Sequence, residues 1–120
     1  MTVRSYRDLK VWQKAMSLVV GCYQLSRRFP KSELYGLTSQ MQRAAVSVPA
    51  NIAEGHGRSS TGAFMNHLSI SHGSLMELET HLLLANRLNY CSNDELKQLL
   101  TMAEEVGKMI QGLRHSLEKN

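Results

Sequence analysis

The sequence predicts an all-α protein, an antiparallel up-and-down four-helix bundle that occupies residues 1–120 as a single domain. Apolar residues recur every three or four positions in four separate segments, which is the spacing of one buried helical face. Short loops separate the segments, so consecutive helices are expected to run antiparallel. No alternating strand pattern competes, and 120 residues that are 42% hydrophobic suit one domain with one core.

The first predicted helix opens with Ser5 and Asp8, whose S-x-x-D spacing is typical of a capping box. It ends before Phe29-Pro30, because proline disfavours helical backbone in the residue that precedes it. The residues expected on its buried face are Leu9, Trp12, Met16, Val19 and Tyr23.

The second predicted helix begins near Ser32-Glu33 and runs to Glu54, where Gly55-His56-Gly57 stops it. Pro49 lies inside this helix and removes one backbone donor, at a cost of ~3 kcal/mol. We therefore expect either a bend or packing tight enough to tolerate the proline. Its apolar stripe is Leu34, Leu37, Met41, Ala44, Val48 and Ile52.

The third and fourth predicted helices carry seams of heptad spacing. Ser59-Ser60-Thr61 offers caps for the third, and Ser92 with Glu95 forms an S-x-x-E capping box for the fourth. The third seam is Phe64, Leu68, Ser71, Leu75, Leu78, Leu82 and Ala85. The fourth is Leu96, Leu99, Ala103, Val106, Ile110, Leu113 and Leu117.

Positive charge is concentrated in the first half of the chain. Fourteen Lys and Arg against ten Asp and Glu give a net charge of +4. Residues 1–58 hold nine basic and three acidic residues, a net of +6, whereas residues 59–120 hold five basic and seven acidic, a net of −2. This asymmetry favours a basic face that meets a polyanion such as nucleic acid. A solubilising surface is the alternative.

The first helix carries the clearest basic row. Arg7, Lys10 and Lys14 lie on one side of it, and Arg4 extends the row if the helix begins early. Arg43 and Arg58 are further candidates for the same surface. Such a row can contact phosphates, and no aromatic residues interleave with it to stack bases, so backbone contact is expected rather than base readout. A solvated helix face is the alternative interpretation.

The second helix has little fully polar surface. Its one narrow polar stripe consists of Arg43, Ser47, Asn51 and Glu54. A third face carries only Val46, Ala50 and Ala53. We expect this helix to be enclosed, either at the centre of the bundle or against another subunit. The stripe is interpreted as a structural polar network, because nothing in the sequence supplies the partner that a catalytic Glu54 needs.

Other function classes find no support in the sequence. Two cysteines, Cys22 and Cys91, are too few for a disulfide scaffold, and no apolar run suits a signal peptide or membrane span, so a cytoplasmic protein is expected. The five histidines lack metal-ligand spacing, and no phosphate-binding loop or cofactor motif occurs. The R-x(4–6)-H motif of a helical ribonuclease class is also missing. We expect no enzyme, metal or cofactor.

Longer segments of the chain resemble a known bacterial family. They are Asp8–Ala15, Phe29-Pro30, Glu33, Tyr35–Thr38 with Gln40, Arg43–Gly55 and Gly73–Thr80. Together these are similar to the four-helix-bundle proteins named for intervening sequences in bacterial 23S ribosomal RNA genes. The long Arg43–Gly55 motif is the most specific part, and the resemblance covers nearly the whole chain.

The resemblance implies a four-helix bundle that assembles as a homopentamer, a barrel of five bundles. One related branch serves diversity-generating retroelements, where a basic pentamer works with a reverse transcriptase and nucleic acid. No settled activity is implied for the intervening-sequence branch. The sequence thus supports a non-enzymatic oligomeric bundle that binds RNA or DNA through phosphates. A structural or protein-partner scaffold is the alternative, and a nuclease is a weaker third.

Overall fold

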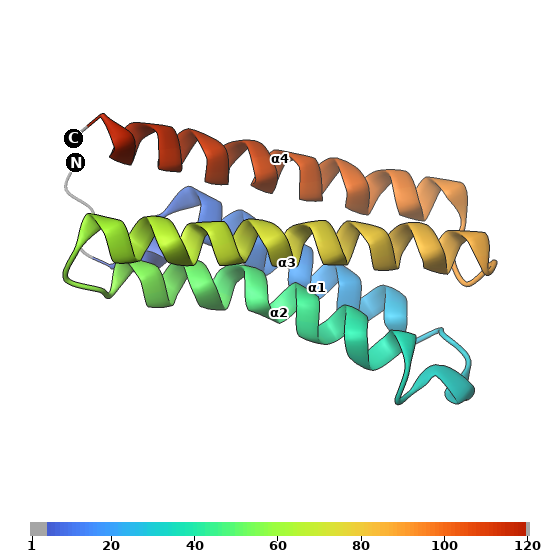
Figure 1. Cartoon of the computed structure of the whole chain (residues 1–120). Coiled ribbons are helices and arrows are strands. Elements are labelled where there is room, and N and C mark those ends of the chain that lie inside the picture. Colours follow the sequence, from blue (N-terminus) through green and yellow to red (C-terminus); the bar gives the residue numbers. More distant parts are fainter. Residues whose placement is uncertain (1–4, 120) are drawn as a thin grey trace.

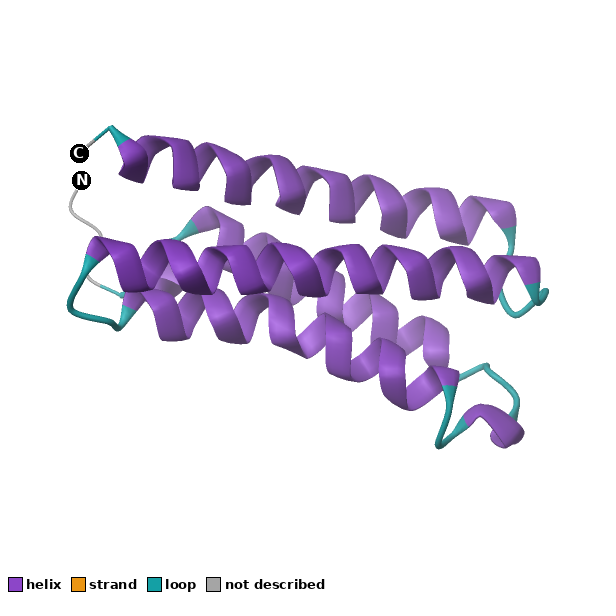
Figure 2. Cartoon of the chain, viewed as in Figure 1, coloured by secondary structure: helices purple, strands orange, loops and turns teal. Residues whose placement is uncertain are grey.

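A computed structural model describes residues 5–119 as four antiparallel helices joined by short connections (Figure 1). They are α1 (Lys10–Ser26), α2 (Leu37–His56), α3 (Thr61–Arg87) and α4 (Asn93–Glu118), with 3-10 helices η1 (Tyr6–Asp8) and η2 (Lys31–Glu33). Each helix packs against two neighbours, and α1 meets α4 to close the bundle. Figure 2 shows helices and loops with no strand among the described residues, which confirms the predicted fold class.

One hydrophobic core runs the length of the bundle and draws on all four helices. The seams predicted for α3 and α4 are confirmed, with Phe64, Leu96, Leu113 and Leu117 partly buried at their ends and the remaining members buried. The largest fully buried side chains include Leu18, Met41, Ile52, Leu68, Leu75, Leu78, Leu82 and Ile110.

The predicted buried face of α1 is wrong. The helix instead buries Val11, Ala15, Leu18, Cys22 and Leu25. Met16, from the predicted stripe, is 40% exposed, and its other members are only partly buried. At 100° per residue the two stripes are about a third of a turn apart, and both are present because α1 is apolar around much of its circumference. Periodicity alone finds both stripes, and packing against the other helices selects one.

The predicted start of α2 is also wrong. Residues 31–33 form the separate η2, α2 begins at Leu37, and Leu34 is 54% exposed. Glu33 joins the two pieces. Its Oε1 accepts a hydrogen bond from the Leu37 backbone N–H at 3.2 Å, and its Oε2 accepts one from the Tyr90 hydroxyl at 2.8 Å. Glu33 therefore caps α2 and ties it to the α3–α4 connection.

α3 packs closely against the part of α2 that contains Pro49. Helix α2 continues through buried Pro49, and the Ser71 hydroxyl donates to the carbonyl of neighbouring Val48 at 2.8 Å. Gly55 marks the closest approach, since a Cβ there would lie 2.6 Å from Cβ of His67. Tight packing around Pro49 is one of the two outcomes expected from the sequence, the other being a bend. Helix α2 runs to His56 with Gly57 as its C-cap, so it ends within the predicted Gly55-His56-Gly57 stop but two residues beyond the predicted Glu54.

The predicted capping residues take up their roles. Ser5 and Asp8 form a capping box, although it opens η1 rather than α1, and Ser92 with Glu95 forms one at the start of α4. The Ser60 side chain accepts from the Ala63 N–H at 3.1 Å and caps α3. At the far end of α3, Asn89 adopts a positive φ of 64°, the left-handed conformation that commonly terminates helices.

Replacing the buried Leu78 tests this core. Leu78→Ala is expected to lower the free energy of unfolding by ~2–5 kcal/mol, through lost apolar transfer and the cavity left behind. Leu83→Ala on the same helix is the matched control, because Leu83 is largely exposed. Urea unfolding followed by circular dichroism measures both. Equal losses in the two variants would contradict the helix register described here.

Candidate nucleic-acid interface and the polar face of α2

The predicted basic row does not lie on one continuous helix. Arg4 falls outside the described residues. Arg7 belongs to η1, and Lys10 is the first residue of α1. Leu9 between them has extended backbone, with φ −73° and ψ 122°, which separates the two turns. The Arg7 guanidinium lies 5.7 Å from the ring centroid of Tyr6, so this cation stacks on an aromatic face while remaining exposed.

Lys14 is held by a carboxylate of the bundle. Its Nζ lies 2.6 Å from Glu105 Oε2 on α4. Further along the same α1–α4 seam, Arg28 pairs with Glu95. The first pair joins α1 to α4, and the second joins the segment that follows α1 to the first turn of α4. Exposed pairs of this kind contribute roughly 0.2–1 kcal/mol each. A phosphate would have to compete with Glu105 for Lys14, which weakens its candidacy as a nucleic-acid contact.

In the described part of the chain Arg58 is paired with a carboxylate, whereas Arg43 is not. Arg58 Nη2 lies 2.9 Å from Glu54 Oε1, one helical turn away. Arg43 is exposed, and within residues 5–119 no ion pair joins Arg7, Lys10 or Arg43 to a carboxylate. Among the predicted phosphate contacts in the described residues, these three are therefore the ones whose positive charge is not paired with a carboxylate. They form no single patch, because Arg43 lies roughly 20 Å along α2 from the end of that helix that approaches the start of α1.

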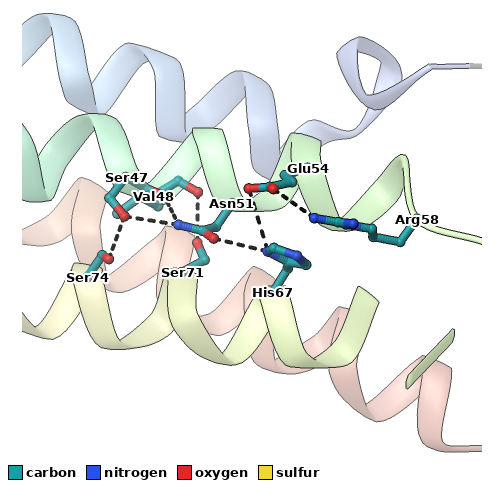
Figure 3. Close-up of polar contacts among 8 residues, drawn as sticks. All are labelled: Ser47, Val48, Asn51, Glu54, Arg58, His67, Ser71 and Ser74. Carbon is teal, nitrogen blue, oxygen red and sulfur yellow. Dashed lines mark hydrogen bonds and ion pairs between the residues drawn. The ribbon is translucent and has the colours of Figure 1, made fainter. Parts of the chain in front are cut away.

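Three of the four predicted stripe residues, Ser47, Asn51 and Glu54, belong to a chain of polar contacts between α2 and α3 (Figure 3). The hydroxyls of Ser47 and Ser74 lie 2.8 Å apart. Asn51 Nδ2 donates to the carbonyl and the hydroxyl of Ser47, at 2.9 and 3.0 Å. Asn51 Oδ1 lies 3.1 Å from His67 Nδ1, and because an amide oxygen only accepts, that ring nitrogen carries the proton. Side chains of α3 thereby satisfy the polar groups of α2.

Glu54 completes the chain at the far end of α2. Its Oε2 lies 3.9 Å from Nδ1 of His67, and its Oε1 holds Arg58. His67 is only 14% exposed in its side chain and points back toward α2 in Figure 3. No serine hydroxyl within the drawn network contacts the imidazole, so the arrangement lacks the nucleophile–base pair of a hydrolase. The contacts join side chains of α2 to side chains of α3.

The α3 side of this network does not follow from the sequence motifs. From the sequence alone, His67 is considered only as a candidate metal ligand, and no motif identifies Ser74 as a functional residue. A usable signal is nevertheless present, because Ser71 and Ser74 lie on the buried side of an otherwise leucine-rich helix. Buried hydroxyls need partners, and a small side chain at such a position permits close helix packing.

The outer face of α2 carries apolar side chains with no partner in the described chain. Val46 is 43% exposed and Ala50 is also exposed, so α2 is not at the centre of the bundle, which corrects one of the two expectations for it. Val46 shares a groove with Tyr23 of α1, and Met16 lies two turns from Tyr23 on the same side of α1. We name Met16, Tyr23, Val46 and Ala50 the α1–α2 outer face.

The remaining reactive groups are enclosed or scattered. Burial raises the pKa of the Cys22 thiol to about 12, and burial also raises the pKa of Cys91, so both thiols are poor nucleophiles at neutral pH. The part of the chain that the structure describes contains no cluster of three His, Cys, Asp or Glu side chains suited to a metal ion. Within residues 5–119, no helix combines the length and apolar content needed to cross a bilayer.

Removing the central amide of the polar chain tests its structural role. Asn51→Ala leaves the buried His67 N–H without its acceptor, so the free energy of unfolding is expected to fall by roughly 1–3 kcal/mol. Asn66→Ala on the exposed side of α3 removes the same group and should change stability by under about 0.5 kcal/mol. Chemical unfolding compares the two. Indistinguishable effects would show that the chain of polar contacts contributes nothing to the α2–α3 packing.

Comparison with known proteins identifies the family. The family model for the 23S rRNA-intervening sequence protein matches residues 7–112. Among curated proteins none matches the chain. A crystal structure of a protein of unknown function from the S23 ribosomal protein family of Bacteroides thetaiotaomicron VPI-5482 superposes with a TM-score of 0.81. It is 23% identical, covering 87% of this chain and 97% of that one, and so shares the fold. The chain therefore belongs to the 23S rRNA-intervening sequence protein family.

Proposed function

We propose that this protein is a non-enzymatic, oligomeric accessory protein that binds RNA or DNA through the phosphate backbone. The observation that carries the proposal is a pair of exposed cations near the start of the bundle, Arg7 in η1 and Lys10 at the first position of α1, neither of which forms an ion pair with a carboxylate within residues 5–119. They belong to the half of the sequence that holds a net charge of +6. Cations presented in this way attract polyanions and release their counterions.

Oligomerisation is part of the proposed function. Two unpaired cations in one protomer would bind a polyanion only weakly, so several protomers are needed for useful affinity. A ring repeats the pair in every subunit, so that individually weak contacts add through multivalency. The α1–α2 outer face supports assembly, since it includes the exposed apolar side chains of Met16, Val46 and Ala50. The family resemblance suggests five subunits, and a reverse transcriptase is the protein partner suggested by analogy with one related branch.

A scaffold without a nucleic-acid role is the second candidate. Two of the predicted phosphate contacts, Lys14 and Arg58, are paired with carboxylates of the same chain. This is how charges are arranged when they only stabilise a surface. The two candidates differ in whether the protein binds nucleic acid in a salt-dependent manner.

Neutralising the free cations tests nucleic-acid binding. Arg7→Gln/Lys10→Gln should weaken binding to a labelled RNA and lower the slope of log affinity against log salt by about one for each phosphate that is no longer neutralised. Lys97→Gln/Lys108→Gln on α4 removes the same charge from other exposed positions and should leave most of the affinity. Fluorescence anisotropy over a salt series measures both variants. Equal losses would mean that net charge, rather than the start of α1, determines binding.

A second control isolates the paired lysine. Lys14→Gln/Glu105→Gln removes the ion pair without changing the net charge, so we expect nucleic-acid affinity close to that of the wild type. A large loss of affinity would show that Lys14 does contribute to the nucleic-acid-binding surface. A wild-type protein that binds neither RNA nor DNA at low salt would favour the scaffold function.

Disrupting the α1–α2 outer face tests assembly. Light scattering on the wild type should report several times the 13.5 kDa protomer mass. Ala50→Arg should shift the protein toward that protomer mass, because a guanidinium buried in an apolar interface lacks a partner. Asn66→Arg on α3 is the matched control and should leave the assembly intact. A wild-type monomer at micromolar concentration would contradict the proposed oligomer.

A further inference from the structure

A polar groove lies between α2 and α3, on the side of Arg43 away from α1. Its volume is about 620 Å³, which is within the range of small-molecule sites. Arg43 and Gln40 line it from α2, Glu77 and His81 from α3, and Tyr35 from the segment before α2. Val46, by contrast, lines the groove on the α1 side of Arg43.

The groove holds opposite charges that are not paired with each other. Arg43 and Glu77 both line it, yet no ion pair or hydrogen bond joins them. His81 Nδ1 is buried and has no hydrogen-bond partner in the described chain. Burial lowers the pKa of His81 and nearby Glu77 opposes that shift, so the imidazole stays largely neutral at pH 7. The groove is thus lined by a cation, a carboxylate acceptor and an imidazole whose Nδ1 is buried.

Tyr35 adds an aromatic surface to the groove. Tyr35 is 93% exposed, although an aromatic ring in water gains nothing from the fold. It follows η2, and the Glu33 cap of Leu37 orders the short segment on which it stands. The ring is therefore presented to the groove by a well-defined backbone and is available for stacking.

We propose that this groove receives one nucleotide of a single-stranded nucleic acid, with the phosphate on Arg43 and the base against Tyr35. Glu77 then accepts hydrogen bonds from an amino group of the base or a ribose hydroxyl. An aromatic side chain beside a cation is the pairing by which proteins bind single strands, because every base has a π-face and every nucleotide a phosphate. The inference rests on the proposed nucleic-acid function and adds a preference for single strands, since the bases of a duplex are stacked internally.

The preference is tested with a labelled single-stranded RNA and a duplex of equal length. The wild type should bind the single strand more tightly. Tyr35→Ala should weaken single-strand binding about fivefold or more and leave duplex binding unchanged. Tyr35→Phe retains the ring and should restore the affinity. Arg43→Gln should weaken the single strand more than the duplex. Both residues are exposed, and unchanged unfolding midpoints would show that the variants fold.

The outcomes separate this inference from the proposed function. If the wild type bound both probes equally and Tyr35→Ala had no effect, the proposal that the groove binds a nucleotide would be wrong. The proposed binding to the phosphate backbone would still stand. A wild type that binds neither probe would overturn both. Adenosine monophosphate is the third probe, and we expect it to bind far more weakly than the strand. A mononucleotide that binds as tightly as the strand would overturn the assignment to a nucleic-acid strand.

Discussion

The close packing of α2 against α3 is the constraint on which the rest of the structure depends. These helices share the most extensive interface of the bundle. They approach so closely that Gly55 has no room for a Cβ, and Ser71 contacts the backbone of α2 directly. Short side chains make this approach sterically possible. The Ser47, Asn51 and His67 contacts then satisfy the polar groups that the approach buries.

This packing also determines what the protein presents to its surroundings. Because Ser47 and Asn51 of α2 face α3, Arg43, Val46 and Ala50 are left on the outside. The apolar members continue onto α1, while Arg43 stands between two grooves of different character. One helix thus separates a surface suited to subunit contact from a polar groove suited to a ligand.

The basic residues of the described chain fall into two groups in a similar way: some form ion pairs within it, and others remain unpaired there. Lys14 joins α1 to α4, and Arg28 joins the segment after α1 to α4. Arg58, just beyond α2, pairs with Glu54 in the last turn of that helix. Cations used in this way have most of their field cancelled by a nearby carboxylate. The net charge of the first half therefore overstates the charge available to a polyanion, and Arg7, Lys10 and Arg43 are the predicted contacts that retain it.

The sequence by itself determined the helices, their order, most of their caps and the seams of α3 and α4. These features depend on residues a few positions apart, so periodicity and capping patterns reveal them. Only the tertiary structure decided which apolar stripe of α1 is buried, because both stripes have helical spacing and the other helices choose between them. Tertiary structure likewise paired Lys14 with Glu105 and placed Arg43 and His81 in the lining of one groove. Residues distant in the chain meet only when the helices pack, and no local pattern encodes the rotation at which they do so.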